Sequence, residues 1–361
     1  MEGMELAKKL DSESKRFFRD VFTVMRKKRG YFIPIVRHVL WQRQASKLRV
    51  KQETEDFHVP PFMIFSITGQ CNLNCEGCYS KHLHKNIEED LPIEKIDAII
   101  GEAEDLGISI ILLAGGEPLI RKEVLSVAGR HRRVIFPIFT NGLLIDDKVA
   151  KAISEKKNIL PVISLEGDIG QTDRRRGEGV YNSVIGTFRR LSAQQVLFGA
   201  SITVTRKNFE EVTGDTFLND LATRGCSIVF FVEYIPCSEN SENLTLTQEQ
   251  REKLKETLES RREKIKMIFV SFPGDEEMYG GCLAAGRGFI HVSSGGRVEP
   301  CPFSPYSDMS LSRSRLRDAL NSEFLKKIRE NHDLLVEHQG GCALWENREW
   351  VKQEMNGKND V

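Results

Sequence analysis

Short apolar runs alternate with amphipathic segments through the middle of the chain. The apolar runs predict strands at residues 62–68, 109–113, 134–139, 160–165, 198–204 and 228–234. The segments between and after them predict helices at 92–106, 121–128, 146–154, 181–191, 208–222 and 247–264. Six buried strands, each followed by a helix, indicate a parallel α/β sheet. Because six units are too few to close an eight-stranded barrel, the pattern predicts a partial (β/α)6 TIM-like barrel over residues 59–267.

Other patterns flank this barrel. Residues 1–58 are rich in Lys and Arg, and apolar side chains recur among them at helical spacing: Phe17, Phe18, Val21, Phe22 and Met25, then Phe32, Ile35, Val36, Val39 and Leu40. This predicts a basic helical N-terminal extension, which either packs on the barrel or contacts a membrane surface or an acidic partner. Residues 268–361 contain a glycine-turn hairpin at 289–299 and predict a small C-terminal α+β domain.

Composition narrows the function classes. The 361 residues carry 52 basic and 52 acidic side chains, so no global attraction to nucleic acid is expected. The sequence shows no N-terminal signal segment and no apolar run of membrane-spanning length, which predicts a cytoplasmic protein. Eight cysteines in a reducing compartment are better explained as metal ligands than as disulfides.

Three of these cysteines stand together directly after the first predicted strand. Cys71, Cys75 and Cys78 have the spacing C-x3-C-x2-C. Thiolates are the usual ligands of iron–sulfur clusters, and a cubane cluster needs four of them. Three cysteines on one loop therefore predict a [4Fe-4S] cluster with one open iron, able to bind another ligand.

A second motif, Gly115-Gly116-Glu117-Pro118, follows the second predicted strand. Two adjacent glycines allow a ligand to approach the backbone closely. The carboxyl ends of parallel strands meet at one edge of a sheet or barrel, where functional loops gather. The glycine motif is therefore expected to lie beside the cysteine loop.

Together these two motifs resemble the radical S-adenosylmethionine (SAM) superfamily. Thr140-Asn141-Gly142, Ser164-Leu165-Glu166-Gly167 and the run from Arg174 to Gly179 extend the resemblance. These later elements are similar to the branch that carries a C-terminal SPASM or twitch domain. The resemblance covers about residues 60 to 345.

The resemblance implies an enzyme that binds SAM at the open iron and cleaves it reductively. The resulting 5′-deoxyadenosyl radical would abstract hydrogen from a substrate C–H bond. By the family pattern, Gly115, Gly116 and Glu117 meet the SAM amine, and Ser164 with Arg175 or Arg176 meets its carboxylate. Glu166 is implied for the ribose hydroxyls and Asn141 for the adenosine side. A reductant such as flavodoxin or ferredoxin is also implied.

The chain departs from the family pattern just before the third cysteine. The family often has an aromatic residue there, whereas this sequence has Gly77 and places Tyr79 after the cysteine. Tyr79 is therefore the candidate for the aromatic contact to adenine.

A second cysteine set comprises Cys282, Cys301 and Cys342 around and beyond the predicted hairpin. It resembles a reduced SPASM domain of the twitch type and implies one auxiliary iron–sulfur cluster. Cys237, after the sixth predicted strand, is the candidate fourth ligand, with His291, His338 or substrate as alternatives. Cys226 lies beside an apolar run and is expected in the core.

The substrate side is less defined. Glu233 and Tyr234 end the sixth predicted strand, so they are candidates to steer substrate or accept a proton at the barrel mouth. A peptide or protein side chain is the first candidate substrate, and a small molecule or lipid is the alternative. A non-enzymatic iron–sulfur electron carrier or binding module is the competing class, but it would not need the Gly-Gly-Glu-Pro motif.

Overall fold

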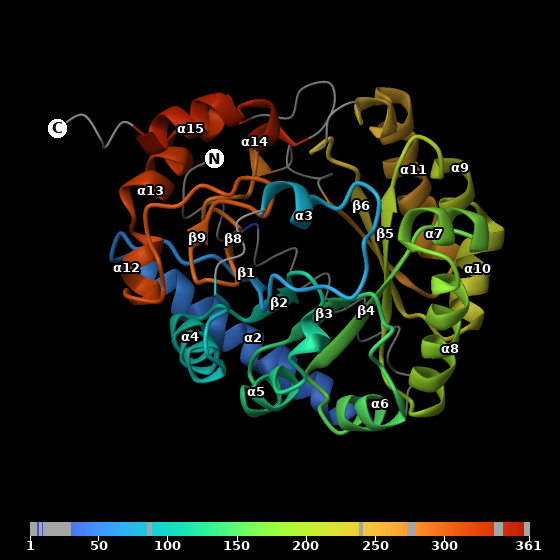
Figure 1. Cartoon of the computed structure of the whole chain (residues 1–361). Coiled ribbons are helices and arrows are strands. Elements are labelled where there is room, and N and C mark those ends of the chain that lie inside the picture. The colour runs from blue at the N-terminus through green and yellow to red at the C-terminus, as the bar shows by residue number, and fades with distance from the viewer. Residues whose placement is uncertain are drawn as a thin grey trace.

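The strands of the chain form one curled sheet. The computed structural model describes Leu6, Lys9 and residues 30–84, 89–237, 241–272, 279–335 and 342–356, except for the side chains of Arg262 and Glu263. Within these residues the sheet has nine strands in the order β7-β6-β5-β4-β3-β2-β1-β8-β9. All neighbouring pairs are parallel except β8 and β9, which are antiparallel. The predicted partial barrel is therefore confirmed, and Figure 1 shows how the sheet curls around a central space.

The strands are short, as expected for buried parallel strands. Their bounds are β1 Phe62–Ser66, β2 Ile110–Ala114, β3 Phe136–Thr140, β4 Ile159–Leu165, β5 Gly199–Val204, β6 Ile228–Glu233, β7 Ile268–Phe272, β8 Phe289–Val292 and β9 Val298–Glu299.

Most helices cover the outer, convex face of the sheet, whereas α3, α14 and α15 lie at one end of it (Figure 1). Their bounds are α2 Phe32–Glu53, α3 Tyr79–Leu83, α4 Ile93–Leu106, α5 Val124–Arg130, α6 Asp147–Ser154, α7 Ile169–Arg176, α8 Val180–Ala193, α9 Phe209–Val212, α10 Asp215–Thr223, α11 Gln248–Lys264, α12 Leu316–Leu320, α13 Glu323–Glu330, α14 Ala343–Glu346 and α15 Arg348–Asn356. Short 3₁₀ turns lie at η1 Pro118–Ile120, η2 Glu242–Leu244 and η4 His332–Leu334.

The two faces of the sheet bury different side chains. Met63 and Phe65 of β1 are fully buried in the main core between sheet and helices. A separate apolar cluster of Val162, Ile228, Phe230 and Ile268 lies on the opposite, concave face, together with Phe139, Leu160 and Val270. The alternation along each strand therefore separates a structural face from a face that lines the central space.

The sheet is larger than the sequence pattern predicted. β7 pairs in parallel with β6. This strand was not expected, because only three residues separate its first residue, Ile268, from the end of α11. The predicted hairpin is confirmed as β8 and β9, but it does not stand apart from the barrel, because Phe62 to Phe65 pair with Phe289 to Val292. The expected helix at 208–222 is two helices, α9 and α10, divided at Thr213 and Gly214.

The N-terminal helix α2 buries only part of the expected apolar face: Ile35 is buried and packs with Val39, whereas the other expected side chains are exposed. Phe32, Ile33, Val36 and Leu40 are 40–62% exposed, whereas the polar side chains of Gln42, Arg49 and Gln52 are buried. These three donate hydrogen bonds to the carbonyl oxygens of Ser109, Gly107 and Leu106.

The physical reason is that the last carbonyl groups of a helix and the entry to a strand lack backbone partners. The polar face of α2 supplies donors to those groups at the end of α4 and the start of β2, beneath the sheet (Figure 1). The first expected apolar segment, Phe17 to Met25, lies outside the described residues. None of the helices that the structure describes is long and apolar enough to span a bilayer.

Candidate functional site

The cysteine loop lies between β1 and α3, at the carboxyl edge of the sheet. Cys71 is exposed, Cys75 and Cys78 are half-buried, and all three are free thiols. Burial raises the pKa of the Cys71 thiol, and the neighbouring Glu117, Cys75 and Cys78 raise it further. Cys71 therefore lies within electrostatic reach of both Cys75 and Cys78, and a bound cation relieves the repulsion between such thiolates. This donor set fits three ligands of an iron–sulfur cluster.

The two glycines after β2 lie directly beneath this loop. A Cβ on Gly116 would stand 2.0 Å from the Gln70 carbonyl oxygen, and one on Gly115 would stand 2.4 Å from the Thr68 carbonyl oxygen. Gly116 and Glu117 donate backbone hydrogen bonds to Thr68 and Gln70 at 2.8 and 2.7 Å. The glycines are thus required because the chain's own backbone approaches here, which the sequence had attributed to a ligand.

Glu117 is fully buried, and its carboxylate is already occupied. It accepts hydrogen bonds from Leu119 N at 3.0 Å, Thr140 Oγ1 at 2.7 Å and Asn141 N at 2.8 Å. Burial raises the pKa of Glu117, and these three donors partly oppose that shift. The carboxylate therefore joins the ends of β2 and β3, and Thr140, which the sequence did not single out, takes part.

Asn141 connects the end of β3 to the cysteine loop. Its side-chain amide donates to Asn72 Oδ1 at 2.7 Å, and its Oδ1 accepts from Leu143 N at 3.0 Å. On the other side of the loop, Asp90 accepts from Thr68 Oγ1 at 2.5 Å and Gly69 N at 3.0 Å. The loop and the residues before it are thus held by the side chains of Asn141 and Asp90. The sequence had singled out Asn141, in the Thr-Asn-Gly motif, but not Asp90.

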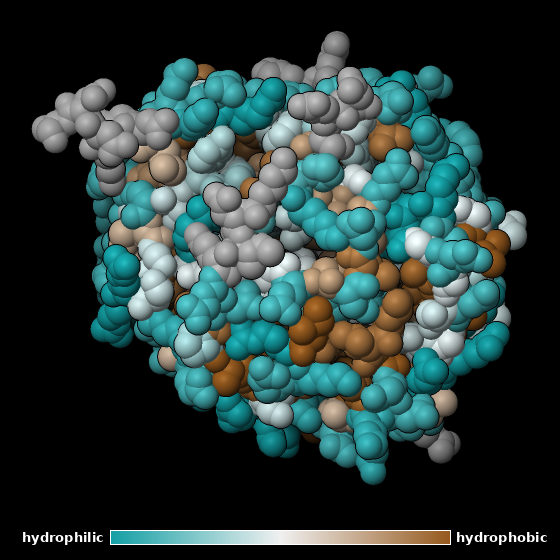
Figure 2. Space-filling model, viewed as in Figure 1, coloured by the Kyte–Doolittle hydropathy of each residue, from teal (hydrophilic) through white to brown (hydrophobic). Residues whose placement is uncertain are grey.

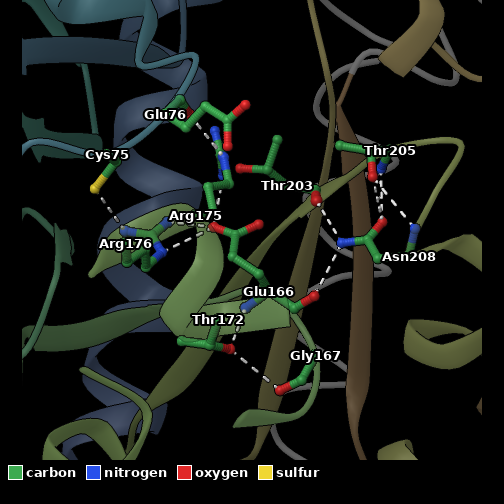
Figure 3. A network of polar contacts seen from close by, with 10 residues as sticks. All are labelled: Cys75, Glu76, Glu166, Gly167, Thr172, Arg175, Arg176, Thr203, Thr205 and Asn208. Carbon is green, nitrogen blue, oxygen red and sulfur yellow. Dashed lines mark hydrogen bonds and ion pairs between the residues drawn. The ribbon is translucent and has the colours of Figure 1, made fainter. Parts of the chain in front are cut away.

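Glu166 forms ion pairs with Arg175 and Arg176, the last two residues of α7 (Figure 3). Its Oε1 accepts from Arg175 Nη1 at 2.5 Å and from Arg176 Nη2 at 2.5 Å. Arg176 also reaches to 3.9 Å from Cys75 Sγ, and Arg175 donates to the Glu76 carbonyl oxygen at 3.2 Å. Burial works to lower the pKa of Arg176, but Glu166 and the thiols of Cys75 and Cys78 outweigh it, so the net pKa is raised.

The second carboxylate oxygen of Glu166 is buried, and among the described residues it has no hydrogen-bond partner. A buried carboxylate oxygen without a donor costs free energy unless a ligand supplies one. This atom therefore marks the place where the protein is incomplete without a bound group that carries a hydroxyl or N–H donor.

Asn208, in the turn between β5 and α9, holds the backbone at Glu166 (Figure 3). It is buried and donates to the carbonyl oxygens of Glu166 at 2.9 Å and Thr203 at 3.0 Å. Its Oδ1 accepts from Thr205 N at 2.7 Å. Nothing in the sequence pattern identified Asn208, because most of its partners are backbone groups at the ends of β4 and β5.

Ser164 lies on β4 opposite Ser201 of β5 and is half-buried. Ser164 follows Val162 by two residues, so both side chains point to the concave face of the sheet. Ser164 therefore lies on β4 two residues before Glu166, which pairs with Arg175 and Arg176.

The second cysteine set is drawn from four separate segments. Cys282 and Cys301 are buried, and Cys237 and Cys342 are half-buried. The pKa of Cys237 is raised to about 12, mainly by burial and further by the thiols of Cys342 and Cys78. Cys237 and Cys342 therefore lie within electrostatic reach of each other. Cys226 donates its S–H to the Ile228 carbonyl oxygen at 3.2 Å inside the core, and His338 lies outside the described residues.

Tyr79 lies between the two cysteine sets. Its ring centroid is 4.9 Å from that of Phe303 and 6.5 Å from that of His84. Burial raises its pKa, and Cys78, Cys301 and Cys237 raise it further. The ring packs against the C-terminal region rather than over the Glu166 and Arg176 cluster, so its position does not favour the adenine contact expected for it.

Glu233 and Tyr234 separate at the end of β6. Glu233 continues the outward alternation of Val229 and Phe231 and pairs with Arg251 of α11, with Nε 2.7 Å from Oε2. Burial raises its pKa, and Arg251 partly opposes the shift. Its position contradicts the expected place at the barrel mouth, because strand alternation turns it toward the helices.

Tyr234, in contrast, reaches the cysteine loop. A Cβ on Gly77 would lie 2.8 Å from Tyr234 Oη and 3.1 Å from Tyr234 Cε2. Gly77 also has a positive φ of 64°, which favours glycine. The ring of Tyr234, which directly follows β6, thus fills the space next to Gly77. Gly77 is the position where the family pattern often has an aromatic residue.

Comparisons with known proteins agree with this geometry. Residues 65–212 match the family model of the radical SAM superfamily. The AdoMet-dependent heme synthase of Methanosarcina barkeri is 26% identical over 320 residues, which cover 80% of this chain and 89% of that protein. The mycofactocin maturase MftC of Mycolicibacterium smegmatis is 26% identical over 314 residues, covering 81% and 77%.

Solved structures share the fold. The crystal structure of Streptococcus suis SuiB bound to S-adenosylmethionine superposes with a TM-score of 0.63 at 18% identity, over 79% of this chain and 69% of that chain. SuiB bound to its precursor peptide SuiA gives a TM-score of 0.62 at 17% identity, over 79% and 70%.

Proposed function

The chain belongs to the radical SAM superfamily of iron–sulfur enzymes, and we propose from this premise that it modifies a peptide or protein side chain on the concave face of its barrel. The family implies a [4Fe-4S] cluster and SAM. When bound, these supply reductive cleavage of a carbon–sulfur bond and a 5′-deoxyadenosyl radical that takes a hydrogen atom from the substrate.

Cys71, Cys75 and Cys78 would hold the cluster. Support comes from three mutually close thiols on a loop that is fixed on both sides by Asn141 and Asp90. The guanidinium of Arg176 near Cys75 would offset the negative charge of the thiolates. The surrounding residues thus orient the thiolates and hold positive charge next to them.

Several of the residues proposed for SAM contact this loop or the residues that lead into it. The Glu166 oxygen that lacks a partner is the observation that carries the assignment, because a ribose hydroxyl is a donor of the kind it needs. Ser164 and Arg175 or Arg176 remain proposed for the carboxylate. Gly115 and Gly116 remain proposed for the amine through their carbonyl oxygens, while Glu117 would act by holding β2 to β3.

We further propose that Cys237, Cys282, Cys301 and Cys342 bind one auxiliary cluster in a twitch-type C-terminal domain. The electrostatic reach between Cys237 and Cys342 supports the grouping, and Cys78 of the first set also lies within reach of Cys237. Iron analysis tests it, since a protein with two [4Fe-4S] clusters holds twice the iron of a protein with one.

The concave face supports a substrate with an apolar part. Phe139, Leu160, Val162, Phe230 and Val270 gather there. In Figure 2 hydrophobic surface also collects in the region of β3 and β4. The fold shared with peptide-bound SuiA–SuiB favours a peptide side chain as the first candidate. A tetrapyrrole or another small apolar molecule is the second, because the heme synthase relative matches over most of its length.

One experiment tests the radical chemistry. Anaerobically reconstituted protein, given dithionite and SAM, should release 5′-deoxyadenosine. No product from protein that holds a [4Fe-4S] cluster would overturn the proposed activity.

A second experiment separates the substrate classes. Peptide and small-molecule fractions are prepared from cells grown in deuterated medium, and each is added to the reaction. Deuterium in 5′-deoxyadenosine from the peptide fraction alone supports the first candidate. Deuterium from the small-molecule fraction alone replaces it with the second.

Two partners complete the proposal. A reduced flavodoxin or ferredoxin would deliver the electron. An anionic membrane surface would contact the exposed face of α2, where Phe32, Ile33, Val36 and Leu40 lie beside Arg37, Arg43, Lys47 and Lys51. Apolar side chains flanked by exposed cations match the chemistry of an anionic lipid interface.

Liposome flotation tests this contact. The protein should float with vesicles that contain phosphatidylglycerol, and Ile33→Ser/Leu40→Ser should reduce the floated fraction. Leu334→Ser, at an equally exposed leucine outside α2, is the matched control. Equal flotation of all three proteins would remove the membrane from the proposal.

A further inference from the structure

Three side chains form a hydrogen-bonded chain, and one of them is His291, which the sequence offered as an alternative fourth ligand of the second cysteine set. Ser66 Oγ lies 2.8 Å from His291 Nε2, and His291 Nδ1 lies 2.7 Å from Glu299 Oε2. They come from β1, β8 and β9, so the chain exists only because the hairpin pairs with the barrel. His291 and Glu299 are 1% and 0% exposed. A buried chain of hydrogen bonds of this kind fixes the orientation of its outermost member.

That outermost member, Ser66, opens onto the concave face. Met63 and Phe65 point into the core between sheet and helices, so Ser66, which alternates with them, points the other way. Ser66 is half-buried at the carboxyl end of β1, immediately before the loop that carries Cys71. Its hydroxyl therefore faces the space proposed for substrate.

The direction of each hydrogen bond follows from Glu299. Arg297 Nη2 lies 3.0 Å from Glu299 Oε1, which pairs the side chain as a carboxylate, and a carboxylate only accepts. Nδ1 of His291 must then carry the hydrogen. In the neutral ring Nε2 is an acceptor, so the Ser66 hydroxyl donates to it. The remaining lone pairs of Ser66 Oγ are left to face the concave side.

A metal ion is the competing reading of the same residues. Ligand atoms of His84, His291 and Glu299 lie within 4.8 Å of one another. However, both ring nitrogens of His291 already have partners, and His84 Nε2 lies 3.0 Å from the Pro302 carbonyl oxygen. The observed pairing therefore matches a hydrogen-bond chain better than an open ligand set.

We propose that Ser66, oriented by His291 and Glu299, is a hydrogen-bond acceptor that selects substrates presenting an N–H or O–H donor to the concave face of the sheet. The inference deepens the proposed function, in that it assumes substrate binds on the concave face. Ser66 touches the substrate, whereas His291 and Glu299 are positioning residues.

Nitrogen-15 NMR of the histidine rings tests the chain without any turnover. His291 should show a protonated Nδ1 and an unprotonated Nε2. Glu299→Gln should shift or broaden these resonances, because an amide no longer fixes the tautomer. A ring protonated at Nε2 would reverse the Ser66 hydroxyl and overturn the proposal.

Fragment binding tests the selectivity. Indole has one N–H donor on an apolar ring, and 1-methylindole has none. Wild-type protein should bind indole about two- to twelvefold more tightly, the span of one net hydrogen bond. Ser66→Ala should abolish this preference while keeping affinity for 1-methylindole. Ser201→Ala removes another concave-face serine and should keep the preference.

Two results would overturn the inference. One is equal binding of the two probes by the wild type. The other is stoichiometric zinc or iron that survives Cys→Ala changes but is lost in His291→Ala. A protein that makes no 5′-deoxyadenosine would sink the proposed function, yet it would leave the probe preference intact, so the two failures are distinguishable.

Discussion

The two cysteine sets are built in opposite ways. Cys71, Cys75 and Cys78 share one short loop, which is fixed by hydrogen bonds from Asn141 and Asp90. Cys237, Cys282, Cys301 and Cys342 come from four segments, after β6, before β8, after β9 and at the start of α14. The first set is a local structure, whereas the cysteines of the proposed second set can meet only when the C-terminal region has docked on the barrel.

The two sets differ in the chain entropy that is lost when their cysteines are brought together. A local loop keeps its ligands close at little cost in chain entropy, while distant ligands must close long loops first. The hairpin that carries Cys301 is anchored by the parallel pairing of β8 with β1. The second set should therefore be more sensitive than the first to damage of the C-terminal packing.

The largest effect is expected at the first set. Changing Cys71, Cys75 or Cys78 to Ala should reduce 5′-deoxyadenosine formation to background, because the cluster loses a ligand. Product is measured by liquid chromatography after reconstitution. Cys226→Ala, a core cysteine, is the control and should keep the activity. Activity retained in all three variants would place the radical site elsewhere.

The comparison is sharpened by the second set. Cys282→Ala/Cys301→Ala should remove about half of the iron and leave SAM cleavage in place, if each set holds one four-iron cluster. Iron content and visible absorbance report the loss. Unchanged iron would show that these cysteines hold no cluster.

A smaller effect is expected at the Glu166 cluster. Glu166→Gln removes the charge that pairs with Arg175 and Arg176, whose side chains are only 18% and 11% exposed. Loss of one partner from a buried pair costs about 3–5 kcal/mol of unfolding free energy. Urea denaturation measures it.

The matched control for that change is Glu210→Gln. Its partner is Lys253, and both side chains are more than half exposed. The control should stay within about 0.5 kcal/mol of the wild type. Equal losses in the two variants would mean that Glu166 is not the anchor described.

The smallest effect is expected at Glu233, whose carboxylate pairs with Arg251 of α11. Glu233→Gln should keep SAM cleavage, since the carboxylate faces Arg251 and not the concave side. Burial raises the pKa of Glu233 in the folded protein. A raised pKa gives stability that is present below the unfolded pKa and is lost as pH rises through the folded pKa.

The unfolding free energy of the wild type, relative to Glu233→Gln, should therefore fall as the pH rises through that raised pKa. Urea titrations over a series of pH values measure the trend. The opposite slope would mean that Arg251 dominates over burial, and loss of SAM cleavage would restore Glu233 to the active site.

The sequence by itself determined the local features. Alternation of apolar runs and amphipathic helices gave the parallel barrel, because these periods follow from backbone geometry. The spacing of Cys71, Cys75 and Cys78, and the glycines at 115 and 116, predicted two neighbouring loops at one edge of the sheet, because each feature lies within one loop or at one strand end.

Only the tertiary structure decided features that depend on distant partners. Which face of α2 is buried depends on the carbonyl groups of Leu106 and Gly107. The outward turn of Glu233 depends on the exact bounds of β6, since a shift of one residue reverses a strand side chain. The Ser66, His291 and Glu299 chain needs three strands to meet, which no spacing along the sequence encodes.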